Sequence, residues 1–169
     1  MKRIIHLLLL IVLPFIGIQA DDSIPNHNDS PLSISLELTT KYMWRAIEYG
    51  DAPTSFAIIN YEHKGFSAYA EGVYAFNGSH SEVDLGVAYN YKWLTVGVND
   101  YYYPSSVGEK DHYFKLSSRK TGHYLEGAVT LAPENIPLWL TLSNYFWGAD
   151  KKPANDKNAY SSYAEIGCS

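Results

Sequence analysis

The sequence predicts an all-β protein, an antiparallel up-and-down transmembrane β-barrel with about eight strands in this chain. Apolar and polar side chains alternate along most of the chain after residue 31, as in strands that have one apolar and one polar face. The alternating segments are about ten residues long, and short and longer connections between them alternate. Aromatic residues, which make up 15% of the chain, gather near the segment ends. These three observations are typical of a barrel that crosses an outer membrane.

The N-terminal segment, residues 1–20, has the parts of a secretory signal peptide. Two basic residues precede an apolar run over residues 4–18, and Ala20 stands directly before a polar segment. Pro14 breaks a run that is already too short for a membrane-spanning helix, so we expect cleavage and export rather than an anchor. Residues 21–31 contain Pro, Asn and Asp and are expected to be a flexible lead-in. Residues 32–169 would form the barrel domain.

Alternation predicts the strands one after another. They cover residues 32–45, 54–64, 66–76, 81–91, 93–103, 123–132, 138–148 and 159–168. In the first strand the apolar face carries Leu32, Ile34, Leu36, Leu38, Tyr42 and Trp44. Later strands repeat the pattern. For example, Leu85 and Asp84 lie on opposite faces of one predicted strand, and Leu142 and Ser143 lie on opposite faces of another.

The connections alternate in length in the same order. Tight turns are expected at Lys64-Gly65, at Asn77-Gly78 and at Lys92, and a short one over residues 133–137. Longer loops are expected over residues 46–53, 104–122 and 149–158. We keep residues 112–118 within a loop, because another strand there would reverse the order of short and long connections.

Aromatic rings near both ends of the strands predict two girdles at the headgroup levels, where a ring has an apolar body and a polar tip. The girdle residues are Tyr42, Trp44, Tyr74, Tyr91, Trp93, Tyr102, Trp139 and Trp147.

Charged residues occupy the polar faces and predict the lining of the lumen, because charges facing lipid are costly. The lining residues are Glu37, Lys41, Arg45, Glu71, Glu82, Asp84, Glu126 and Glu165. Their excess of carboxylates would favour cations or neutral solutes over anions in an open pore. Alternatively, Lys41 and Arg45 form internal salt bridges that plug a narrow eight-stranded barrel.

Three short blocks resemble a known family. They are Tyr42-Met43-Trp44-Arg45-Ala46, Gly65-Phe66-Ser67-Ala68-Tyr69 and Glu82-Val83-Asp84-Leu85-Gly86. They are similar to recurring blocks of the TorF-type porin family of Gram-negative outer-membrane β-barrel proteins, from about residue 32 to the end. The resemblance implies an exported barrel and solute passage, and it supplies no catalytic residues.

This sequence departs from the family pattern in two places. Ala46 stands where the family usually has Gly after the Arg, and the chain ends at Ser169 without the terminal aromatic residue common in such barrels. Family members generally continue for several more strands. We therefore expect a C-terminally shortened member, whose strands either belong to a larger barrel or close by themselves, since eight is the smallest usual even number of strands.

Composition and motifs narrow the function. The net charge of −5 argues against a nucleic-acid partner, and the single cysteine, Cys168, excludes a disulfide framework. Without a Gly-x-Ser-x-Gly elbow, a phosphate-binding loop or a His-Glu-x-x-His motif, we expect no enzyme activity, cofactor or metal. The expected partners are the lipid bilayer of the outer membrane, the outer-membrane assembly machinery and small hydrophilic solutes.

Three alternatives remain open from the sequence. One is a secreted carbohydrate-binding β-sandwich that uses Tyr101–Tyr103 and Tyr145–Trp147 as stacking platforms. Another is a non-conducting structural barrel of the outer membrane. The third is a barrel enzyme that uses the carboxylate pair of Glu82 and Asp84.

Overall fold

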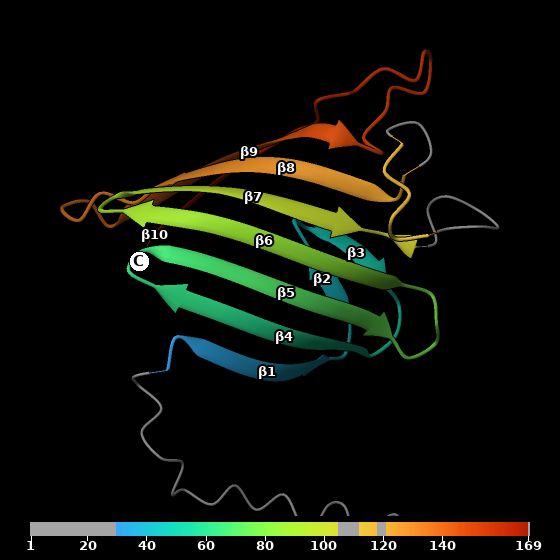
Figure 1. The fold of residues 1–169 in the computed structure, drawn as a ribbon, viewed down its shortest axis with the longest axis horizontal. Coiled ribbons are helices and arrows are strands. Elements are labelled where there is room, and N and C mark those ends of the chain that lie inside the picture. The colour runs from blue at the N-terminus through green and yellow to red at the C-terminus, as the bar shows by residue number, and fades with distance from the viewer. Residues whose placement is uncertain (1–29, 105–111, 118–120, 169) are drawn as a thin grey trace, which may run out of the picture. The chain divides into compact units, whose positions relative to one another are not determined.

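The computed structural model describes residues 30–104, 112–117 and 121–168. The predicted signal peptide and residues 21–29 of the predicted lead-in lie outside this part of the chain. Within it, no helix is long and apolar enough to span a membrane. The described residues form one eight-stranded sheet and one separate two-stranded hairpin (Figure 1).

The large sheet is an antiparallel meander, in which each strand pairs with the next sheet strand along the chain. Its strands are β1 (Leu32–Thr39), β4 (Thr54–His63), β5 (Phe66–Ala75), β6 (Ser81–Tyr91), β7 (Leu94–Tyr102), β8 (His123–Leu131), β9 (Leu138–Gly148) and β10 (Ser162–Cys168). The all-β, antiparallel prediction is therefore confirmed. Residues 112–117 contain no strand, in agreement with their placement in a loop.

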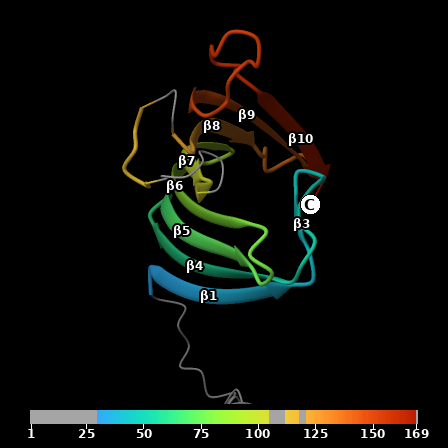
Figure 2. The same cartoon turned by 90° about the vertical axis from the view of Figure 1, so that its right-hand side faces the viewer.

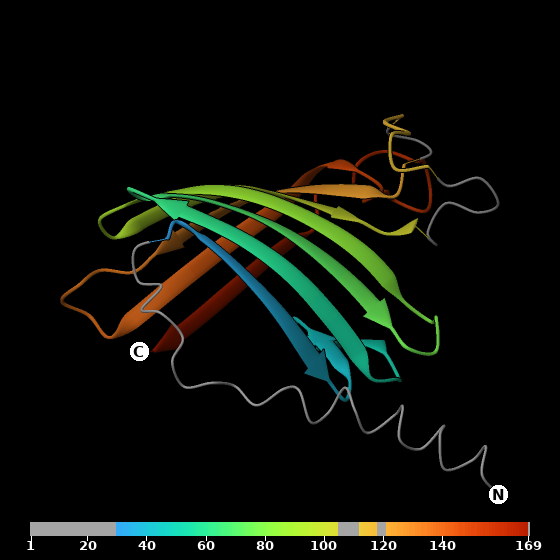
Figure 3. The same cartoon turned by 60° about the horizontal axis from the view of Figure 1, so that its bottom comes forward.

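The first predicted strand is wrong beyond Thr39. Residues 42–50 instead form a hairpin of β2 (Tyr42–Trp44) and β3 (Ile47–Gly50), in place of the end of a strand and the start of a loop. Its turn residues, Arg45 and Ala46, both have positive φ angles, 50° and 62°. Positive φ at both central residues matches the right-handed twist of a tight hairpin, although it is strained for residues other than Gly. Figure 3 shows the hairpin leaving the end of β1.

The eight-stranded sheet curls strongly but is not closed into a barrel. Among the described residues, β1 pairs only with β4 and β10 only with β9, so each keeps one unpaired edge. Figure 2 shows the hairpin between these two edges. It touches both sides of the opening, since Tyr42 packs against Phe56 of β4 and Arg45 lies over the Tyr163 ring of β10. The predicted closure is therefore absent from this structure.

Burial in the sheet is the reverse of that in an ordinary soluble protein. Apolar side chains cover the outer face and remain exposed, as Leu36 at 71% and Leu85 at 41% show. The inner face, toward the hairpin, buries charged side chains, with Glu82, Asp84 and Glu126 exposed by only 1–3%. A sandwich would place the apolar faces of two sheets against each other. The described residues contain no second large sheet, so the sandwich alternative does not describe this fold.

Candidate functional site: the inner face beneath the hairpin

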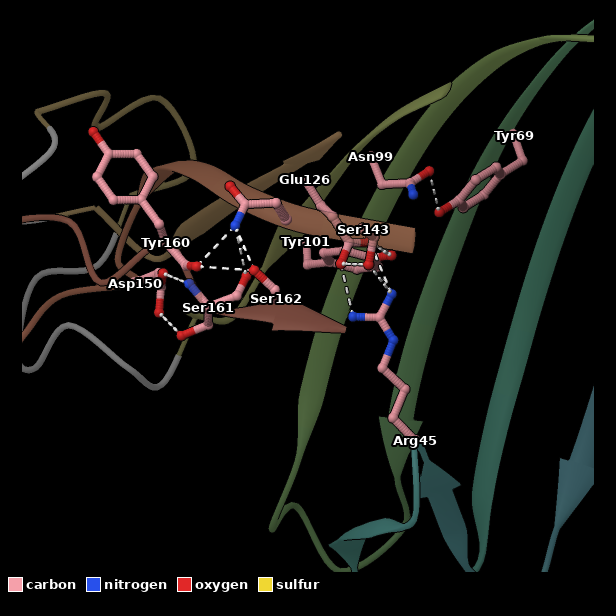
Figure 4. Close-up of polar contacts among 11 residues, drawn as sticks. Arg45, Tyr69, Asn99, Tyr101, Glu126, Ser143, Asp150, Tyr160, Ser161 and Ser162 are labelled. Carbon is pink, nitrogen blue, oxygen red and sulfur yellow. Dashed lines mark hydrogen bonds and ion pairs between the residues drawn. The ribbon is translucent and has the colours of Figure 1, made fainter. Parts of the chain in front are cut away.

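An ion pair joins the tip of the hairpin to the middle of the sheet. Arg45 Nη1 donates to Glu126 Oε1 at 2.7 Å and Nη2 donates to Oε2 at 2.9 Å, which is a bidentate arrangement (Figure 4). Arg45 Nη2 also lies 3.3 Å from the hydroxyl oxygen of Ser143 on β9. Arg45 is thus a turn residue with a positive φ angle whose side chain reaches Glu126 on β8.

Glu126 is held by more than the arginine. The hydroxyl groups of Tyr101 and Ser143 donate to its carboxylate at 3.0 and 2.7 Å. Burial alone would lower the pKa of Arg45, but the hydrogen bonds and charge of Glu126 outweigh burial and raise that pKa. The guanidinium also stacks between the Trp44 and Tyr163 rings, 4.1 and 4.2 Å from their centroids. The pair therefore fixes the hairpin to β8, β9 and β10.

A second contact fixes the base of the hairpin to β6. The Tyr42 hydroxyl donates to Glu82 Oε2 at 3.2 Å, and His80 Nε2 lies 3.0 Å from the same oxygen. The Tyr42 ring packs against the rings of Tyr49 and Phe56. Burial and then the negative charge of Glu82 raise the pKa of the Tyr42 phenol, so it remains a neutral donor. Glu82 is thus a structural acceptor for the hairpin.

A pocket of about 370 Å³ lies between the hairpin and the inner face of β1, β4, β5, β6 and β7. Glu37, Lys41, Glu71 and Asp84 line it, together with aromatic rings from the hairpin and the sheet. Glu71 and Asp84 face each other in register across β5 and β6. Asp84 is 3% exposed, and its Oδ1 atom has no hydrogen-bond partner among the described residues. Three acidic side chains, those of Glu37, Glu71 and Asp84, therefore line one pocket.

The predicted lining residues fall into four groups. Glu37, Lys41, Glu71 and Asp84 line the pocket, and Arg45 with Glu126 forms the buried ion pair. Glu82 accepts from Tyr42 and His80. Lys41 pairs with Glu48 of the hairpin at 2.9 Å, where both side chains are exposed. Glu165 is exposed on β10, opposite Thr141 in the register.

The predicted girdle residues are divided between the two faces. Tyr74, Tyr91 and Trp93 are at least half exposed. Tyr42 and Trp44 do not lie on the outer face, because the hairpin turns them inward against Glu82 and the Tyr101 ring.

The remaining girdle residues make specific contacts. Trp139 lies opposite Gly167 in the register, and its ring occupies the space that a Cβ at Gly167 would need. Tyr102 is buried against Tyr113 and His123, and Trp147 lines an apolar pocket near the loop end of the sheet.

Sequence reasoning missed a polar cluster at that loop end. His123 is 1% exposed, and its Nδ1 lies 2.8 Å from Asp100 Oδ2. The other ring nitrogen, Nε2, lies 2.6 Å from the backbone oxygen of Tyr113. The pair therefore holds the segment over residues 112–117 against the sheet. The sequence feature that could have indicated this cluster is Asp100, because its carboxylate shares a strand face with the apolar Val96 and Val98.

No three or more His, Cys, Asp or Glu side chains in the described ranges are arranged to hold a metal ion. Comparison of the chain with models of protein families, with curated proteins and with solved structures finds no match.

Proposed function

We propose that this chain is an outer-membrane β-barrel protein with acyl chains against its outer face and a polar interior. Its function would be porin-like, the passage of small hydrophilic solutes along an acidic path that the hairpin narrows. The observation that carries the proposal is the reversed burial: Ile34 and Leu36 are 74% and 71% exposed, while Glu126 is 1% exposed. An apolar outer face of this extent promotes aggregation in water, whereas in a bilayer it contacts acyl chains favourably.

Insertion in a membrane requires that the two free edges find partners. Each unpaired N–H or C=O group in hydrocarbon costs several kcal/mol, so an open edge is not viable there. In an eight-stranded antiparallel meander the first and last strands run in opposite directions, so β1 and β10 can pair with each other. Both strands also carry apolar side chains that are largely exposed, such as Leu36 and Ile166. We infer that the seam closes between β1 and β10 in the bilayer.

Cell fractionation tests the location. The full chain, expressed in a Gram-negative host, should appear in the outer-membrane fraction and should need detergent for extraction. Recovery of the folded protein in the soluble periplasmic fraction without detergent would contradict the proposal.

A non-conducting structural barrel is the second candidate, and the Arg45–Glu126 pair favours it because the pair holds the hairpin inside the sheet. Conductance in planar bilayers separates the two candidates. A porin-like protein should give discrete current steps, and Arg45→Ala should enlarge them by releasing the hairpin. Lys41→Ala removes a charge directly before the hairpin but breaks only the exposed ion pair with Glu48, so it is the matched control. Featureless traces from the wild type and from Arg45→Ala would favour the structural role.

A further inference from the structure

The pocket beneath the hairpin contains a buried carboxylate oxygen without a hydrogen-bond partner among the described residues. Asp84 is 3% exposed and lines the pocket, and its Oδ1 atom has no partner in the described part of the chain. Leaving a buried carboxylate oxygen unpaired is costly, more so than for a neutral group. The neighbouring Glu82 is engaged by Tyr42 and His80. Asp84 also shares a side-chain hydrogen bond with Glu82, which two carboxyl groups can form only through a shared proton, and Oδ1 is the atom left for a partner from outside the chain.

The electrostatics around Asp84 favour a positive charge. Glu71 lies directly opposite it across β5 and β6, and like charges in this position destabilise a sheet. Glu37 lines the same pocket. The only lysine of the lining, Lys41, pairs with Glu48 at 2.9 Å. Neither Glu71 nor Asp84 forms an ion pair with a described residue.

The other walls of the pocket indicate the kind of cation. Aromatic rings from the hairpin and the sheet line it, namely Tyr42, Trp44, Phe56, Tyr69 and Tyr101. Figure 4 shows Tyr69 and Tyr101 extending from the sheet on the same side as Arg45. Rings attract organic cations through their faces, whereas a small metal ion needs several oxygen ligands around it. The described carboxylates do not form such a ligand set.

We propose that this pocket binds a small organic cation that carries one ammonium or guanidinium group, with Asp84 and Glu71 as its counter-ions and the aromatic rings around its carbon atoms. Asp84 Oδ1 accepts a hydrogen bond from the cation. The inference deepens the proposed function, on which it rests for its biological meaning, because it names the solute class that the acidic interior would take.

Calorimetric titration of the full chain in detergent micelles tests the site, with n-butylammonium chloride as the probe. The neutral analogue 1-butanol has nearly the same shape and lacks the charge. We expect n-butylammonium to bind at least about 10-fold more tightly than 1-butanol, since a charged hydrogen bond is formed. Asp84→Asn should weaken the binding of n-butylammonium roughly 10-fold or more.

Two further variants complete the design. Glu62→Gln makes the same change of charge at an exposed position at the other end of β4, outside this pocket, and should leave the affinity unchanged. Glu71→Gln should also weaken the binding of n-butylammonium. If circular dichroism shows that Asp84→Asn does not fold, Glu71→Gln takes its place in the test.

Several results would overturn the inference. Equal affinities for n-butylammonium and 1-butanol would do so, and so would an affinity that both pocket variants leave unchanged. A preference for Ca²⁺ that is lost in Asp84→Asn would replace the organic cation by a metal ion. The assay needs no membrane. Absence of binding in a protein that conducts therefore contradicts this inference alone, whereas binding by a protein that is soluble in the periplasm contradicts only the proposed function.

Discussion

Replacing Arg45 by alanine removes the ion pair that holds the hairpin inside the sheet. The side chain of Glu126 is 1% exposed, so the substitution leaves a buried carboxylate without its positive partner. Breaking a buried pair in this way typically costs about 3–5 kcal/mol. Tyr101 and Ser143 continue to donate to Glu126, which places the expected loss near the lower end, about 3 kcal/mol. Loss of the stacking on Trp44 and Tyr163 adds a smaller amount.

The assay is urea unfolding of the purified protein in detergent, followed by tryptophan fluorescence, for the wild type, Arg45→Ala and Lys41→Ala. Lys41 and its partner Glu48 are 54% and 43% exposed, so Lys41→Ala should cost at most about 1 kcal/mol. Arg45→Met combined with Glu126→Leu removes both charges together and should recover most of the stability. If Arg45→Ala is no less stable than Lys41→Ala, the ion pair does not anchor the hairpin and the reasoning is refuted.

Three other tests, two of them with a control substitution, address different parts of the structure. Gly86→Ala should lower the free energy of unfolding by about 1–3 kcal/mol, because its Cβ would overlap the tyrosine ring that faces it across the sheet. Gly72→Ala, which has no atom within 4 Å of the new Cβ, should be close to neutral in the same urea titration. Asp100→Asn should weaken the contact with the buried histidine and speed proteolysis between residues 112 and 117, whereas wild-type cleavage rates would contradict that contact. Leu36→Lys should reduce insertion into vesicles, by about 2–4 kcal/mol if it lies at the midplane, and Glu37→Lys on the inner face should not. Equal insertion of these two variants would argue against lipid contact.

The positions of most strands could be predicted because alternation is a local property. The segment predicted over residues 54–64 is β4 at Thr54–His63, and its turn lies at Lys64 and Gly65 with positive φ angles. For the same reason, alternation does not predict the hairpin over residues 42–50. Tyr42 keeps the even spacing of Leu36 and Leu38, so alternation places it on their face although the chain has already left the sheet. The signal in the sequence was the run of three polar residues over 39–41.

For the candidate site, the sequence predicts which face of the sheet each residue occupies, but not which residues contact one another. Alternation places Arg45 and Glu126 among the inward charges, but their contact spans 81 residues of sequence and depends on how far the hairpin reaches into the interior. The same limit applies to the pocket. Glu71 and Asp84 become neighbours only through the register of β5 and β6, which the turn over residues 76–80 sets.

Alternation of apolar and polar residues does not predict whether the sheet closes, because an open and a closed sheet direct the same side chains outward. The free edges of β1 and β10 remain hydrated in water, and leaving them unpaired there has a small cost. In hydrocarbon the same groups lose their water, and several kcal/mol for each group then favours pairing. The hairpin already contacts β4 and β10, so pairing of the two edges would enclose it rather than displace it. In the proposed barrel, the surroundings of the chain would therefore decide closure, and the Arg45–Glu126 pair would decide how much of the enclosed interior stays open.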